Sequence, residues 1–275
     1  MTDDAPLRIE RGEAIDWIVF DRPDVANALS SELLEEFSKA LTSLAAHGAP
    51  VIGIRGAGKG FSAGIDLGQY NAKSTPLQDV MRLRRNIERW LEIWKCRKPV
   101  IVAIHGFCMG IAAQIPVFAD IVIVADDARI SEPGLPLGGG YIAPTWVNQV
   151  GSKRAKEFAF LPGNFIDGLT AEKWGLANAA VPAENLITCV TEMAARMALV
   201  PAEVLMVKKQ SINRAMEAAG FLTAINAVAE SDAILHLEPS VQKLRSRISN
   251  EGLKAVLSDY RGTSSTEIFD KHRRK

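Results

Sequence analysis

The chain has 275 residues, of which 48% are hydrophobic and 23% are charged, as is typical of a soluble globular protein with a sizeable core. Its 32 basic and 32 acidic residues cancel to a formal net charge of zero. That balance argues against nucleic acid or a membrane as a partner, because both reward a basic surface and no apolar run reaches the roughly 18 residues that span a bilayer.

The N-terminus and the cysteines indicate the compartment. The chain opens with the acidic segment Met1–Asp4, where a signal or transit peptide would be basic. Cys96, Cys108 and Cys189 are few and widely spaced, which fits reduced core thiols and gives no metal-ligand spacing. We therefore expect a cytoplasmic protein without a metal ion.

The first part of the chain alternates strand and helix signals. Residues 7–20 predict strands, and the turn-forming residues 21–24 end them. Ser30 or Ser31 can cap a helix whose apolar residues recur at helical spacing up to Leu44. A buried strand over 50–55 then leads into the glycine-rich segment 56–64, and a second helix is expected over about 77–95.

The same order repeats further along the chain. We expect a strand over 99–104, a helix of small residues near 110–118 and an apolar strand over 121–125. Repeated strand, turn and helix units of this kind indicate an α/β core. Beyond about residue 150 the pattern becomes helical, with amphipathic runs over 201–219 and 230–257.

These patterns divide the chain into three parts. Residues 1–200 form the α/β core, and residues 201–262 form a helical region that we expect to pack on the core or on another subunit. Residues 263–275 are polar with a basic end, and we expect a frayed tail there.

Five segments, in order and in spacing, resemble those of one known family. They are Arg22–Leu29, Phe61–Leu67, the run from His105-Gly106 through Gly110 to Asp120-Ile121, Gly175–Asn178, and Val181-Pro182. This set resembles the enoyl-CoA hydratase/isomerase (crotonase) family over about residues 8–260. The resemblance implies a crotonase-like spiral of β-β-α turns with a C-terminal helical region, assembled as a homotrimer or a hexamer.

The two glycine-rich segments also have a physical interpretation. Chemistry on a thioester places negative charge on its carbonyl oxygen, and two backbone N–H groups aimed at that oxygen stabilise it. Glycine and alanine beside each donor let the substrate approach the backbone closely. The resemblance places the two donors at Ile65 and Ile111, although the family usually has glycine at position 111.

The resemblance further implies an acyl-CoA or enoyl-CoA substrate and no cofactor apart from the coenzyme A that the substrate carries. Tyr260-Arg261 would reach the CoA phosphates of a neighbouring subunit. The expected substrate-binding residues lie mainly in the two loops. They are Ala26, Ala63, Gly64, Ile65, Asp66, Leu67, Gly68, Gly110, Gly134 and Tyr141.

The acidic residues that the family uses for proton transfer are missing. Their positions correspond to Gln114, Gly134 and Ile142, none of which ionises. Gln114 can hold a water molecule but cannot take its proton. The two-glutamate route to hydration is therefore not expected here.

Glu132 is the candidate replacement. Pro133 favours an extended conformation before it, and residues two apart in an extended segment face the same side. Glu132 should then point to where a side chain at position 134 would have pointed, and act as the base or acid. The alternative is a structural or surface glutamate. Two lesser candidates remain, the phenol of Tyr141 and His105, for which packing or a structural hydrogen bond is the simpler interpretation.

Other classes of protein also fit parts of the sequence. Residues 53–60 imitate a phosphate-binding loop, but Gly60 stands where Ser or Thr would hold Mg²⁺. A non-catalytic acyl-CoA-binding protein is the serious alternative. A hydrolase or C–C lyase acting on a CoA ester is a third possibility. The acyl group, its chain length and the pathway are not specified by the sequence.

Overall fold

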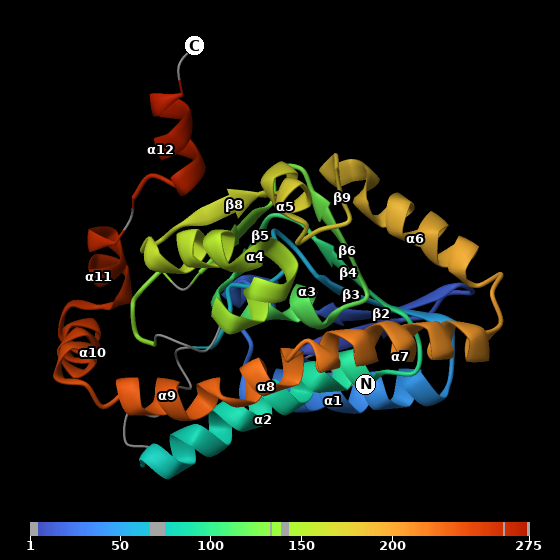
Figure 1. The fold of residues 1–275 in the computed structure, drawn as a ribbon, viewed down its shortest axis with the longest axis horizontal. Coiled ribbons are helices and arrows are strands. Elements are labelled where there is room, and N and C mark those ends of the chain that lie inside the picture. Colours follow the sequence, from blue (N-terminus) through green and yellow to red (C-terminus); the bar gives the residue numbers. More distant parts are fainter. Residues whose placement is uncertain (1–4, 67–74, 133, 139–142, 261, 274–275) are drawn as a thin grey trace.

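The protein has two sheets, stacked helices around them and a helical C-terminal arm (Figure 1). The computed structural model describes residues 5–66, 75–132, 134–138, 143–260 and 262–273. The larger sheet has six strands in the order β1-β2-β3-β4-β6-β9. They are β1 (Leu7–Glu10), β2 (Ile15–Phe20), β3 (Val51–Gly56), β4 (Val100–Ile104), β6 (Ile121–Ala125) and β9 (Ala179–Val181). Only the β1–β2 pair is antiparallel among these described strands.

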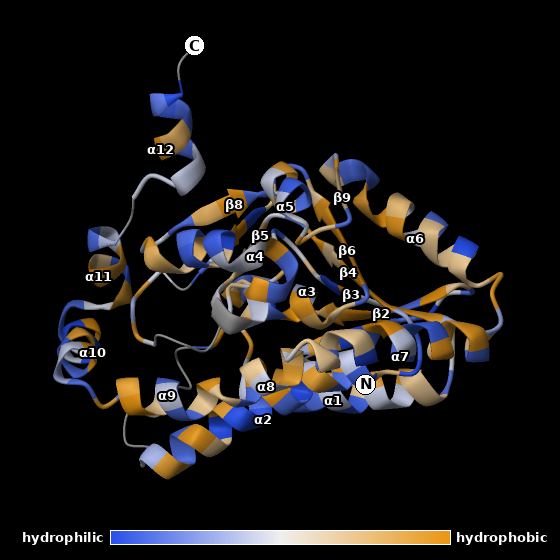
Figure 2. Ribbon diagram, in the orientation of Figure 1, coloured by the Kyte–Doolittle hydropathy of each residue, from blue (hydrophilic) through white to orange (hydrophobic). Residues whose placement is uncertain are grey.

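Alternate residues of the central strands face two separate hydrophobic cores, and these strands are mostly hydrophobic in Figure 2. On one face Phe20 and Val102 join the larger core with α1 (Ser31–Ala46) and α2 (Pro76–Lys95). On the other face Trp17 and Ile101 pack with α6 (Leu186–Met197). Strands covered on both faces read as continuous apolar runs, which is why the sequence predicted them well.

The smaller sheet contains β5 (Phe107–Met109), β7 (Arg129–Ser131) and β8 (Phe165–Asp167). β5 follows β4 and β7 follows β6, and each pair is succeeded along the chain by a helix. The β4-β5 turn and the β6-β7 turn thus each add one strand to each sheet and then a helical segment. This arrangement confirms the predicted α/β spiral of β-β-α turns.

The predicted N-terminal helices are confirmed, with the caps that their sequences suggest. Ser30 accepts a hydrogen bond from Leu33 N at 3.1 Å to begin α1, and Thr75 and Gln78 form a capping box at the start of α2. The expected helix near 110–118 is instead a 3₁₀ helix, Gly110–Gln114, followed by the single turn α3 (Ile115–Phe118). Pro116 has no N–H to bond back to Ala112, which interrupts a continuous α-helix there.

The second half is helical, as expected, but more finely divided. The predicted run over 230–257 is broken by Pro239 and by Gly252, which has φ +86°. The remaining helices are α4 (Ala143–Phe160, kinked at Gly151), α5 (Gly168–Trp174), α7 (Ala202–Ala218), α8 (Phe221–Asn226), α9 (Val228–Leu235), α10 (Pro239–Glu251), α11 (Leu253–Asp259) and α12 (Ser265–His272). In the described residues no single helix is long and apolar enough to cross a membrane; only the pair α7 and 221–235, bent by 64°, meets that test together.

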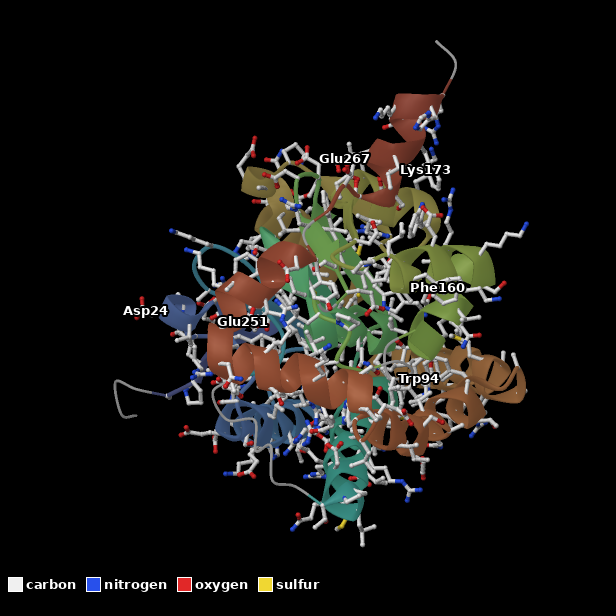
Figure 3. All side chains as sticks on the ribbon, turned by 90° about the vertical axis from the view of Figure 1, so that its left-hand side faces the viewer. Asp24, Trp94, Phe160, Lys173, Glu251 and Glu267 are labelled. Atoms are coloured by element: carbon white, nitrogen blue, oxygen red, sulfur yellow. The ribbon has the colours of Figure 1, made fainter. Side chains whose placement is uncertain are left out.

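α7 is fixed to the core by polar contacts at its buried face. Lys209 Nζ lies 2.6 Å from Asp120 Oδ2 and donates to the carbonyl oxygen of Ile93 at 3.1 Å. Trp94, labelled in Figure 3, packs against Phe221 of α8 with ring centroids 4.6 Å apart. The helical region is therefore continuous with the core rather than a separate unit.

α9, α10 and α11 stand at the left edge of Figure 1 and toward the viewer in Figure 3. A third small core, with Leu244 of α10 and Val256 of α11, packs against Leu135 and Leu137. The C-terminal helices thus cover the segment 134–138, which follows Glu132. The C-terminal helices therefore pack next to the segment that carries Glu132.

The prediction of a frayed tail is wrong for the described residues 265–272. They form α12, which begins with a capping box between Ser264 and Glu267. Asn164 anchors its first turn, since Asn164 Oδ1 accepts a hydrogen bond from Ser265 N at 2.9 Å. A capping box is a local helix signal that outweighed the polar composition here.

Candidate active site

The first glycine-rich loop lies beside the segment that follows the Arg22 turn. Leu29 N donates to Gly64 O at 2.8 Å, and Asp66 N donates to Leu29 O at 3.2 Å. This pairing is that of a parallel bridge between Leu29 and Ile65. It uses the groups on either side of Ile65, so the N–H of Ile65 itself faces away from residue 29.

Asn27 is the hub of this loop. Its Nδ2 donates to the carbonyl oxygens of Ala57 and Gly60 at 2.8 and 2.9 Å, and its Oδ1 accepts from Arg22 N at 2.9 Å. It is buried and left-handed, with φ +53°. Asparagine tolerates that conformation better than most residues do, because its side chain can satisfy nearby backbone groups.

Ser62 and Asp66 complete the support of the loop. Ser62 Oγ donates to Asn27 O at 2.8 Å and accepts from Gly64 N at 3.1 Å. The carboxylate of Asp66 binds Arg22 Nη1 at 3.0 Å. The family resemblance places Asp66 among the substrate-binding residues, and its ion pair with Arg22 shows that it also holds the loop.

The second glycine-rich segment runs alongside the first. Met109 N donates to Ser62 O at 2.9 Å. Gly64 has φ +90°, and a Cβ placed on it would lie 2.6 Å from Met109 O and 3.5 Å from Ile111 N. Only glycine allows so close an approach of the two backbones, and that approach brings Ile65 and Ile111 to neighbouring positions.

The backbone N–H groups of Ile65 and Ile111 are the two candidate donors of this site. Neither has a hydrogen-bond acceptor among the residues that the structure describes. Buried N–H groups in proteins are paired in more than nine cases in ten, so two adjacent unpaired donors are an arrangement that a ligand oxygen would complete. The side chain of Ile111, 8% exposed, packs in the larger core.

Glu132 directly follows β7, the strand that pairs with β5 in the smaller sheet. β5 and β7 are parallel, with Met109 opposite Ser131. Gly110 follows Met109 and Glu132 follows Ser131, so Glu132 lies beside the start of the 3₁₀ helix that contains Ile111. The half-buried Glu132 carboxyl has no hydrogen-bond or ion-pair partner among the described residues.

The surroundings of Glu132 change its acidity. Burial, assisted by the nearby carboxylate of Asp232, raises the pKa of Glu132 to about 8. At neutral pH the group is therefore mostly protonated. A carboxylic acid in that state can give a proton to a reacting carbon, as a surface glutamate cannot.

Gln114 is buried and engaged. Its Oε1 accepts a hydrogen bond from Trp90 Nε1 at 2.9 Å, which ties the turn after Ile111 to α2. The family resemblance expects a carboxylate base at this position. The amide of Gln114 cannot act as that base, and its oxygen instead binds Trp90 of α2.

Gly134 faces the C-terminal helices. A Cβ at this position would lie 2.8 Å from Leu257 Cδ2 of α11, so glycine leaves room for that leucine. The predicted site residues Leu67, Gly68 and Tyr141 lie outside the described residues, as do Ile142, Pro133 and Arg261.

The structural interpretation of His105 is supported. Its Nε2 lies 2.9 Å from Gly58 O, at the end of β4. Cys108 is fully buried, and burial raises the pKa of its thiol far above the usual range. In the described part of the chain no three His, Cys, Asp or Glu side chains gather to hold a metal ion.

Sequence reasoning missed two sets of residues near the site. The first comprises Asn27 and Ser62, whose supporting contacts depend on backbone groups far along the chain. The second comprises Asp79, Asp232 and His236, which join α2 to α9. The spacing of Asp232 and His236, four apart on a helix, was the one local signal of the second set.

Comparison with known proteins gives one consistent result. The model of the family described as "Enoyl-CoA hydratase/isomerase" matches residues 10–247. A solved structure from Novosphingobium aromaticivorans, named for the same family, has 60% identity and a TM-score of 0.96, and the match covers 98% of this chain and 100% of that one. An enoyl-CoA hydratase/isomerase from Xanthobacter autotrophicus has 28% identity and a TM-score of 0.87, with 92% and 96% covered. The hydroxycinnamoyl-CoA hydratase-lyase of Pseudomonas fluorescens is 26% identical over 77% of this chain and 79% of its own length.

Proposed function

The chain belongs to the enoyl-CoA hydratase/isomerase family, and we propose that it is an acyl-CoA enzyme that stabilises a thioester enolate between Ile65 N–H and Ile111 N–H. The observation that carries this proposal is the pair of adjacent backbone donors without acceptors among the described residues. The hydrogen bonds of Asn27 and Ser62 hold the first donor in place before any substrate arrives. Donors fixed in this way stabilise developing charge without reorganisation, and one of them is worth about a hundredfold or more in rate.

Glu132 is the proton-transfer group in this proposal. In the hydration of an enoyl-CoA, water adds to Cβ and the double-bond electrons move to the thioester oxygen, which the two N–H groups stabilise as the enolate. Glu132 gives its proton to Cα, and the carboxylate so formed takes a proton from the added water, which returns Glu132 to its starting state. Gln114 supports no second proton transfer, because a side-chain amide does not ionise; its carbonyl oxygen instead accepts a hydrogen bond from Trp90. We therefore propose a route with a single carboxyl group, in place of the two-glutamate route.

The same chemistry favours a C–C lyase as the second candidate. Cleavage of the Cα–Cβ bond of a β-hydroxyacyl thioester releases the Cβ fragment as an aldehyde or ketone, whose hydroxyl proton passes to water, and leaves the electron pair on the thioester as the enolate. The remaining requirement at Cα is a proton donor. The protonated Glu132 fits this requirement without a second carboxylate. A hydrolase of CoA esters would instead use the N–H pair for a tetrahedral intermediate and would not depend on Glu132.

We propose further that the ligand is an acyl-CoA or enoyl-CoA lined by the two loops, and that the chain assembles as a homotrimer or hexamer in the cytoplasm. Exposed apolar residues on the outer face of α7, among them Val207 and Ile212 at 54% and 64% exposure, support an assembly through the helical region. Sedimentation of the purified protein distinguishes a trimer or hexamer from a monomer.

The test of the activity is a panel of CoA esters that varies chain length and unsaturation. Binding is followed by the thermal shift that a ligand of the folded state produces, and turnover by loss of enoyl absorbance and by release of free thiol. Turnover that Glu132→Gln abolishes supports the proposal, with Glu230→Gln as a control that removes a carboxylate from the surface of α9. Full turnover by Glu132→Gln would refute the role of Glu132. Binding across the panel without turnover by the unmodified protein would identify a non-catalytic acyl-CoA-binding protein.

A further inference from the structure

The second proposed donor, Ile111 N–H, belongs to a short 3₁₀ helix that starts at Gly110 and ends at Gln114. All 5 residues of this helix are buried. A 3₁₀ helix has three residues per turn, so Gln114 lies one turn after Ile111 and the two side chains lie on the same side of the helix. A contact that holds Gln114 therefore also holds the turn that presents Ile111 N–H.

This 3₁₀ helix has little support from its own ends. The hydrogen-bond geometry of a 3₁₀ helix is poorer than that of an α-helix, and long runs are uncommon. At its start, Met109 gives no side-chain cap. At its end, α3 is only one turn long, and Pro116 has no N–H to bond back to the 3₁₀ helix. The position of Ile111 N–H thus depends on contacts from other parts of the fold.

α2 supplies such a contact through Trp90. Trp90 Nε1 donates a hydrogen bond to Gln114 Oε1 at 2.9 Å, and the two residues are 0% and 1% exposed. The indole N–H is a donor only, so it fixes the amide oxygen of Gln114 on the side of α2. Trp90 is itself held by α1, since its ring packs edge to face on Phe37 with centroids 6.2 Å apart. α2 also packs against α3, the turn that continues the 3₁₀ helix (Figure 1).

We propose that Trp90 is a positioning residue, which holds Ile111 N–H in place through its hydrogen bond to Gln114. A buried hydrogen bond is costly to break from one side, because the remaining partner stays in the core without it. Small displacements matter at this site, since a shift of about 1 Å in a reacting geometry can lower a rate by about a hundredfold. In this arrangement, the position at which the family resemblance expects a carboxylate holds the second donor instead.

The inference rests on the proposed use of Ile111 N–H, but one part of its test needs no substrate. Trp90→Phe removes the indole N–H and keeps an aromatic ring, and Gln114→Met removes the acceptor at similar length. The N–H of Ile115 donates to Ala112 O within this turn, so its hydrogen exchange reports how well the turn is held. In the full-length protein without ligand, that exchange should become about fivefold faster or more in each variant.

Trp94→Phe is the matched control on the same helix. Trp94 lies one turn further along α2 and is 5% exposed, and its Nε1 donates to Glu217 Oε1 of α7 at 3.3 Å. This variant loses the same N–H group but keeps the bond between Trp90 and Gln114. It should leave the exchange of Ile115 N–H and the kcat unchanged, even if it unfolds at a lower temperature. If Trp90→Phe does not fold, Gln114→Met breaks the same bond from the other side.

Kinetics supply the second readout, with the CoA ester of the panel that is turned over best. Trp90→Phe should lower kcat by about ten- to a hundredfold and change KM less, because Ile111 N–H acts on charge that develops in the transition state. The double variant Trp90→Phe/Gln114→Met should lose no more than the worse single variant, since both changes break one bond. A merely structural role of Trp90 would lower the melting temperature and leave kcat unchanged.

The outcomes separate this inference from the proposed function. Exchange of Ile115 N–H that is the same in Trp90→Phe and Trp94→Phe overturns the inference, whatever the activity. Faster exchange with unchanged kcat, or kcat losses of the single variants that multiply in the double variant, also overturns it. Faster exchange only in the variants of Trp90 and Gln114, with kcat losses that do not multiply, supports it. If the unmodified protein turns over no CoA ester, the proposed function fails, and the exchange alone then decides whether Trp90 holds the turn.

Discussion

Gly64→Ala tests the geometry of the two N–H donors most sharply among single substitutions. Gly64 has φ +90°, where an L-residue is strained by roughly 1–2 kcal/mol. The new Cβ would in addition lie 2.6 Å from the Met109 carbonyl oxygen and 3.5 Å from Ile111 N. Real Cβ atoms do not approach backbone atoms to 2.6 Å, so the two loops must separate.

The matched control is Gly220→Ala. Gly220 has φ +95°, nearly the same conformation, and a Cβ on it would meet nothing within 4 Å. Gly220→Ala should therefore lose only the roughly 1–2 kcal/mol of backbone strain. Gly64→Ala should lose more free energy of unfolding than this, and the difference measures the clash with Met109.

Gly64→Ala should also lower the turnover rate. Separating the loops moves Ile65 N–H away from the oxygen that both donors bind, and loss of one such donor lowers kcat by about 100- to 1,000-fold. The assay is the turnover of the best CoA ester in the panel, with urea denaturation of both variants. If Gly64→Ala folds and keeps normal kcat, the two N–H groups do not act together on a carbonyl oxygen, and the assignment of the site is wrong.

Three further predictions concern the charged residues. Because the pKa of Glu132 is raised from 4.5 to about 8, the free energy of unfolding should fall as pH rises from about 4.5 to about 8 and then level off. Glu132→Gln should therefore unfold at a higher temperature than the unmodified protein at pH 9 but not at pH 4. The pKa of Asp79 is lowered from 3.8 to about 2, so Asp79→Asn should lower the free energy of unfolding by about 2 kcal/mol near pH 7. This loss should shrink as pH falls from about 4 to 2. Equal losses at pH 7 and pH 2 in chemical denaturation would contradict the prediction. Lys209→Met leaves Asp120 without its cation and should lower the free energy of unfolding by about 3 kcal/mol, whereas a loss below about 1 kcal/mol would mean that the pair does not hold α7 to the core.

The sequence predicted the larger sheet and the two glycine-rich loops because both depend on local signals. Strands that are buried on both faces are continuous apolar runs, such as Val100–Ile104. The loops are marked by Gly64 and Gly110, whose φ values of +90° and +58° are ones that glycine adopts without strain. The close approach of the two loops then follows from the family resemblance, and the structure agrees with it.

The smaller sheet and the contacts of His236 with Asp79 and Asp232 could not be predicted in the same way. β5, β7 and β8 have three residues each, too few to show a period, and their pairing depends on the turn of the spiral. His236 and Asp79 are 157 positions apart in the sequence. The spacing of Glu132 and Gly134 along an extended segment makes Glu132 a candidate, but the raised pKa of Glu132 depends on burial and on the Asp232 charge, which only the folded chain provides.

The central claim is that a thioester carbonyl binds between Ile65 N–H and Ile111 N–H. The most direct measurement is the ¹³C spectrum of an acyl-CoA labelled at the thioester carbonyl, recorded free and bound to the unmodified protein and to Gly64→Ala. Two hydrogen bonds polarise the carbonyl, so its resonance should move downfield on binding, and the shift should be lost in Gly64→Ala. A carbonyl resonance that is the same in the free and bound ligand, with binding confirmed by thermal shift, would contradict the account.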